Sequence, residues 1–186
     1  KFKEIACDET ENQVFKPIIS FNWKNFIKKD KYSVISKTFS KGILIHKLLS
    51  KINFESDIDS AIETSVQEGL FNLDEKYSYR ELLKKIINHK KLNYVFKQGN
   101  IVYTEKEILI PKTGIIRLDR IVITNTSCVL IDYKTGDRKQ EDKTQIINYS
   151  KHLESIVSLP IESFLVYIKD NIEVEKVINH QKQSKL

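Results

Sequence analysis

The residues best suited to chemistry are an acid and a lysine at the end of an apolar segment. Asp132 and Lys134 follow the run Val129-Leu130-Ile131, which is typical of a buried strand. Side chains at positions i and i+2 of a strand share a face, so these two charged groups project together. Charged groups in such a place are costly to bury unless they are paired or bound to a metal.

A second aspartate lies on the segment before. Asp119 lies within the β-prone segment of residues 115–124, and the two segments are expected to pair as a hairpin through residues 124–128. Pairing would bring Asp119 beside Asp132, and a divalent cation would relieve the repulsion between the two carboxylates. Oxygen ligands favour Mg²⁺ or Mn²⁺ over zinc. A surface cluster of salt bridges is the alternative interpretation of the same residues.

Two glutamates extend this acidic pattern. Glu105 and Glu107 lie on the preceding β-prone segment with the i, i+2 spacing of a shared strand face. On spacing alone, either could reach the same cation as Asp119 and Asp132.

The order of these residues resembles the motif of the PD-(D/E)xK nuclease superfamily, in which an acid precedes an Asp-x-Lys strand. Asp119 is followed thirteen residues later by Asp132-Tyr-Lys-Thr-Gly. The fuller pattern is similar to the C-terminal nuclease domain of RecB and AddA, which belong to UvrD-like helicase–nucleases. Four further pieces agree in order: Gly42-x-x-x-His46, Glu105-x-Glu107-Ile108, Gly114 through Asp119-Arg120, and Gln145-x-x-x-Tyr149. The resemblance covers about residues 40–168.

This resemblance implies a set of metal ligands. His46, Asp119 and Asp132 would bind the cation together with the backbone carbonyl of Tyr133. Glu105, favoured over Glu107 by the family pattern, would bind through water or a second cation. The alternative for His46 is an ordinary helix residue beside Ile43 and Leu49.

The resemblance also implies groups that act on the phosphate. Lys134 would orient or deprotonate the attacking water and stabilise charge on the phosphate. Gln145 and Tyr149 share a helical face and would lie near the scissile phosphate or Lys134. The alternative for Tyr149 is a core aromatic residue. Further candidates for contact with phosphate oxygens are Thr135, Arg120 and Arg138.

Two features depart from the family pattern. Leu118 stands where the family often has Gly or Pro, which changes the local backbone and keeps the ligand. The chain has two cysteines, so it lacks the four that a sister branch uses for an iron–sulfur cluster. In its lack of these cysteines, the chain is similar to the RecB and AddA branch of the family.

Composition narrows the class of protein. The 186 residues include 31 basic and 25 acidic ones, a net charge of +6, and 40% are hydrophobic. These values predict a folded globular domain with a mild preference for a polyanion such as DNA. No apolar run approaches the length of a membrane helix, and the cysteine usage favours a reducing cytoplasm. Because the chain has no Met, we expect a piece of a longer protein.

Hydrophobic periodicity predicts an α/β fold in which helices pack on a mixed sheet and an N-terminal region is helical. The resemblance implies that this fold is of the restriction-endonuclease-like type, with a central mixed sheet flanked by helices. We divide the single domain into an extension (1–40), a mainly helical part (41–100), a catalytic α/β core (101–178) and a tail (179–186). Residues 21–55 are expected to be helical, and later helices are expected after Asp57, after the capping box Ser78-x-x-Glu81 and over 140–157. The expected strands are 101–110, 115–124, 128–134, 161–168 and 172–178.

The resemblance, together with the oxygen-rich ligand set, implies a magnesium- or manganese-dependent deoxyribonuclease, with exonuclease action favoured. Its parent would be a helicase–nuclease that processes DNA ends in recombination and repair. The expected partners are DNA, a helicase domain of the same parent chain and a second subunit. The alternatives are a non-catalytic DNA-binding module of the same fold, a stand-alone restriction or junction-resolving endonuclease, and a domain that binds a protein partner.

Overall fold

The computed structural model describes residues 41–110 and 114–178. The predictions for residues 1–40 and 179–186 lie outside these ranges. Within them, no helix has the length and apolar character needed to cross a membrane.

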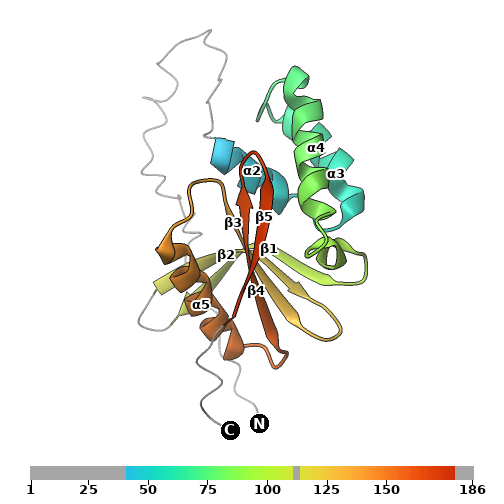
Figure 1. The fold of residues 1–186 in the computed structure, drawn as a ribbon. Helices are drawn as coiled ribbons and strands as arrows, with labels where there is room; N and C mark the ends of the chain where they lie inside the picture. Colours follow the sequence, from blue (N-terminus) through green and yellow to red (C-terminus); the bar gives the residue numbers. More distant parts are fainter. Residues whose placement is uncertain (1–40, 111–113, 179–186) are drawn as a thin grey trace, which may run out of the picture. The chain divides into compact units, whose positions relative to one another are not determined.

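The described residues form a five-stranded mixed sheet with helices on both faces, which confirms the predicted α/β class (Figure 1). The strand order is β1-β2-β3-β4-β5, and every neighbouring pair is antiparallel except β3 and β4. Helix α5 (Gln140–Glu154) connects this parallel pair, because parallel neighbours need a crossover. The strands are β1 Ile101–Ile110, β2 Gly114–Ile123, β3 Cys128–Lys134, β4 Ile161–Ile168 and β5 Ile172–Val177.

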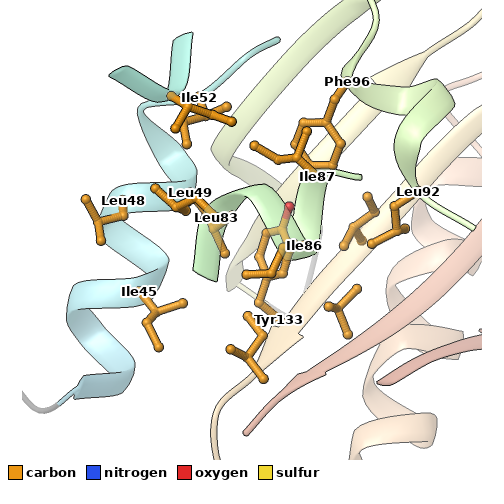
Figure 2. Close-up of a cluster of buried hydrophobic side chains, with 14 of the residues drawn as sticks. Ile45, Leu48, Leu49, Ile52, Leu83, Ile86, Ile87, Leu92, Phe96 and Tyr133 are labelled. Carbon is orange, nitrogen blue, oxygen red and sulfur yellow. The ribbon is translucent and has the colours of Figure 1, made fainter. Parts of the chain in front are cut away.

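The helices divide between the two faces of the sheet. They are α2 Lys41–Ser50, α3 Ile58–Gln67, α4 Lys76–Ile87 and α5 Gln140–Glu154, with short 3-10 turns at Glu55–Asp57, Leu73–Glu75 and Asn93–Phe96. Side chains from α2, α3 and α4 pack with one face of β2–β5 in the larger core. Figure 2 shows Leu48 and Leu49 of α2, Ile86 of α4 and Tyr133 of β3 within this core. Helix α5 covers the other face through Ile146 and Leu153.

β3 is the centre of the architecture. Its residues from Cys128 to Tyr133 are all buried, because helices cover both faces and strands pair on both sides. Odd-numbered residues such as Ile131 and Tyr133 belong to the larger core, whereas Cys128 and Leu130 belong to the core under α5. Asp132 and Lys134 continue the even-numbered series and therefore face α5.

Two helix starts differ from the sequence-based expectation. Helix α4 begins at Lys76, so Ser78 lies inside the helix, and the backbone N–H of Asn72 donates to Glu75 instead. Asp57 does precede α3, but its carboxylate accepts the backbone N–H groups of Asn53 and Phe54. In both places the chain enters the helix through a 3-10 turn, and the acid at the end of that turn accepts backbone N–H groups of residues just before the turn.

Candidate metal-dependent active site

The site begins where β2 and β3 stop pairing. Their register runs from Ile123 opposite Cys128 to Arg120 opposite Ile131, which confirms the predicted hairpin and makes Asp119 and Asp132 the next positions. There the carboxylate of Asp119 accepts the backbone N–H of Tyr133 at 2.8 Å. A side chain thus satisfies a backbone donor that the ladder no longer reaches.

The alternation of side chains also breaks at this point. Leu118 lies in the core under α5, whereas Arg120, two residues later, stacks on Phe96 in the opposite core. Residues two apart in a regular strand would share a face. On β1, Glu105 lies opposite Asp119 between two paired positions and has a φ of 48°. This left-handed conformation costs about 1–3 kcal/mol outside glycine and is common at functional sites.

Helix α2 approaches this break closely because it carries a glycine. A Cβ added at Gly42 would lie 2.4 Å from Oγ1 of Thr135, which follows β3. One helical turn later, the imidazole of His46 lies 3.5 Å from Asp119 (Nδ1 to Oδ2) and edge-on to the Tyr133 ring. The hydrogen bond to Asp119 is the largest influence on the pKa of His46 and raises it, although burial opposes this.

His46, Glu105 and Asp119 converge tightly. Each offers one ligand atom, and these atoms lie within 4.8 Å of one another. Donors around one cation are separated by at most about twice the metal–oxygen distance of about 2.1–2.4 Å, so this set fits a divalent ion. Burial raises the pKa of Glu105, and the charge of Asp119 raises it further. A cation would remove both penalties at once.

Asp132 lies beside this group, in the same cavity of about 580 Å³ as His46 and Asp119. Only 6% of Asp132 is exposed. Burial raises its pKa to about 6, the charge of Asp119 adds to this, and Lys134 opposes it. The Lys134 ammonium lies 2.8 Å from Asp132 Oδ2, an ion pair that lacks aligned hydrogen-bond geometry. Asp132 is therefore next to the cluster of His46, Glu105 and Asp119 but outside it.

Lys134 is held by a chain of polar contacts from α5. Its ammonium donates to Gln145 Oε1 at 2.7 Å, and Gln145 Nε2 donates to the Tyr149 hydroxyl at 2.8 Å. The structure thus brings the two predicted helix residues to the predicted lysine. Tyr149 also packs against the core under α5, so both interpretations of this residue apply.

Sequence reasoning missed Asp142. Its Oδ1 lies 3.9 Å from Lys134 Nζ, and its Oδ2 accepts the backbone N–H of Lys139 and the hydroxyl of Tyr167. Asp142 precedes Gln145 by three residues and Tyr149 by seven, so the three share a helical face. That spacing was the available signal, hidden because an acid in the first turn of a helix is usually a cap.

Several predicted residues lie elsewhere or have other partners. Arg120 is fully buried and donates to the carbonyls of Ile52 and Asn53, so it does not face a phosphate. Arg138 pairs with Glu173 and Glu175 of β5. Glu107 is exposed and outside the cluster that contains Glu105.

Comparison with known proteins does not assign a family. A scan against protein-family profiles and a search of curated proteins both find no match. Among solved structures, the crystal structure of SSO0001 aligns with a TM-score of 0.32 and 20% sequence identity, covering 73% of this chain and 76% of that chain. A similarity of this size supports no conclusion about function, so the site is interpreted from its own geometry.

Proposed function

We propose that this chain is a metal-dependent nuclease that hydrolyses phosphodiester bonds in DNA, similar to the PD-(D/E)xK nuclease domains of RecB and AddA. One observation carries the proposal. A tight group of two carboxylates and an imidazole lies at the point where β2 and β3 diverge, next to a buried Asp132–Lys134 pair. Hydrolysis of a phosphodiester needs charge neutralisation and an oriented water, and this arrangement offers both.

In this proposal His46, Glu105 and Asp119 hold Mg²⁺ or Mn²⁺, with Asp132 and the Tyr133 carbonyl completing the set. The bound cation would polarise the phosphate and lower the pKa of a coordinated water. The protein's own part is to keep the donors together. Asp119 is fixed by the Tyr133 N–H, and His46 is fixed by the close packing of Gly42 on Thr135.

Lys134 acts on the water and on the phosphate charge that develops in the transition state. Its ammonium is fixed by Asp132 and Gln145, with Asp142 close by. Three anchors limit its rotation, which matters because preorganised charge is worth more than mobile charge. Tyr149 positions Gln145 through its hydroxyl.

The proposal extends to the biological setting. The net charge of +6 favours a polyanionic partner, and phosphate contacts by lysines would give weak binding without sequence preference. A helicase domain of the same parent chain and a second subunit would supply the missing affinity by tethering. We place this exonuclease in the cytoplasm, in DNA end processing, recombination and repair.

The decisive experiment measures cleavage of end-labelled DNA by the full chain in Mg²⁺ or Mn²⁺. Lys134→Ala is expected to lower the rate by about two to four orders of magnitude while binding of Mn²⁺ stays within a few-fold of wild type. Lys176→Ala is the matched control, since this lysine pairs with Glu162 on the surface. A chelator should abolish the wild-type activity.

The other outcomes identify the alternatives. Metal and DNA binding without cleavage would indicate a non-catalytic module of the same fold. A sequence-specific cleavage pattern that persists at high salt would indicate a restriction or junction-resolving endonuclease. Equal calorimetric affinity for Mn²⁺ in wild type and in an Asp119→Ala/Asp132→Ala variant would contradict the metal site and leave a protein-binding domain.

A further inference from the structure

Arg117 stands where two cavities meet at the candidate site. One cavity, of about 580 Å³, extends toward α5, and the other, of about 530 Å³, extends along α2. His46, Arg117 and Thr135 line both. A phosphate next to the cluster of His46, Glu105 and Asp119 would therefore lie within reach of the Arg117 guanidinium from either side.

The present partner of Arg117 belongs to that cluster. Its Nε lies 3.0 Å from Oε2 of Glu105, although the residue opposite Arg117 in the β1–β2 register is Glu107. The left-handed backbone of Glu105 turns this acid out of the regular alternation of β1. Arg117 thus serves as a counterion for a candidate metal ligand.

This ion pair is easy to exchange. The Arg117 side chain is 64% exposed, and exposed ion pairs contribute little net free energy because water competes for both groups. A divalent cation held by Glu105 would satisfy the carboxylate more strongly than one guanidinium. Arginine stays charged at all working pH values, and its planar fork matches two oxygens of a phosphate.

We propose that Arg117 is a phosphate-binding residue that exchanges Glu105 for phosphodiester oxygens when a divalent cation binds the cluster. This inference rests on the proposed function, because it concerns the substrate of the same site. It makes cation binding and phosphate binding cooperative through one side chain. Without a cation, Arg117 stays with Glu105, and the carboxylates of the site repel the phosphate.

The test uses the full chain and a fluorescent short oligothymidylate, with anisotropy measured in Ca²⁺ and in chelator. Arg117→Ala is expected to weaken binding in Ca²⁺ by about tenfold or more, because a charged hydrogen bond to phosphate is lost. The affinity of Arg117→Lys in Ca²⁺ should lie between those of wild type and Arg117→Ala, since lysine keeps the charge without the planar fork. In chelator, wild type and Arg117→Ala should bind alike.

Two controls separate this role from a structural one. Arg80→Ala also breaks an arginine–carboxylate ion pair, with Asp59 on α3, and should bind the probe like wild type. Calorimetry should find that Arg117→Ala binds Mn²⁺ at least as tightly as wild type, because a competitor for Glu105 is gone. Weaker Mn²⁺ binding in Arg117→Ala would show that the arginine supports the metal site, and it would overturn the inference.

Two further outcomes of the probe-binding measurement distinguish failure of this inference from failure of the proposed function. Unchanged probe binding of Arg117→Ala in Ca²⁺ would overturn this inference and leave the proposed nuclease intact. If wild type itself shows no cation-dependent binding of the probe, the proposed function fails together with the inference.

Discussion

The first four and the last three residues of β3 are contrasting regions of one strand. Cys128–Ile131 are apolar, fully buried and paired with both β2 and β4. From Asp132 onward the pairing with β4 continues, but the ladder to β2 ends and charged side chains replace apolar ones on the face under α5. On the face under α5, the apolar side chain of Leu130 is followed directly by the charged side chains of Asp132 and Lys134.

This contrast shows how the fold carries an unfavourable charge cluster. Burial and the neighbouring Asp119 raise the pKa of Asp132, so its ionised form destabilises the metal-free fold. The apolar half of the strand, covered by helices on both faces, offsets that cost. The strand end is thereby held in a geometry that its own charges oppose, which is common for sites prepared for a ligand.

The largest effect on stability is expected from a substitution in the apolar half of β3. Leu130→Ala removes a fully buried side chain from the core under α5 and should lower the free energy of unfolding by about 2–5 kcal/mol. Urea denaturation measures this. The control is Leu109→Ala, where the side chain is 74% exposed and the change should stay within about 0.5 kcal/mol. Equal losses in both variants would contradict the assignment of the core.

The next effect concerns the contact that brings α2 to the strand end. Gly42→Ala forces a methyl group against Oγ1 of Thr135 and should cost about 1–3 kcal/mol, with weaker Mn²⁺ binding because His46 moves. Gly136→Ala, with open space around its Cβ, is the control for stability. Addition of Thr135→Ala to Gly42→Ala should restore most of the loss, and an additive double variant would rule out this contact.

A smaller effect of opposite sign is expected at the polar end. Asp132→Asn should stabilise the metal-free protein at pH 7 by about 1 kcal/mol, since it removes a charge whose folded pKa exceeds its ordinary value. The gain is limited because Lys134 loses a partner. Thermal melts in chelator test this, and in saturating Mn²⁺ the order of wild type and variant should reverse. Destabilisation in chelator would mean that the ion pair outweighs the repulsion.

The smallest effect is the pH dependence of the stability difference between Asp132→Asn and wild type. The folded pKa of Asp132 is about 6 against 3.8 for the free side chain, so its stabilising contribution is present below pH 3.8 and is lost as pH rises through 6. The raised pKa of His46 acts in the same direction at higher pH. In chelator, the advantage of Asp132→Asn over wild type should therefore grow between about pH 4 and 6. A flat difference across this range would contradict the shifted titration.

The sequence by itself determined the order of the elements and the placement of Asp119 near Asp132. β-branched and aromatic residues bounded by turn residues define the strands, and a four-residue loop between Ile123 and Cys128 connects the hairpin. The i, i+4 spacing placed Gln145 and Tyr149 on one face of α5, where Gln145 accepts from Lys134 and donates to Tyr149. These are local relations, set by the backbone geometry of a single element or of two adjacent ones.

Only the tertiary structure decided which charged residues gather at the site. Arg120 and Arg117 are three residues apart on β2, yet one is buried against Phe96 and the other is exposed beside Glu105. The break in alternation at Asp119 sends Leu118 and Arg120 to opposite cores, and no period in the sequence signals it. Asp142 likewise reaches Lys134 because α5 packs on the sheet at that turn. Such contacts depend on how distant segments pack, because burial and charge neighbours are properties of the assembled fold.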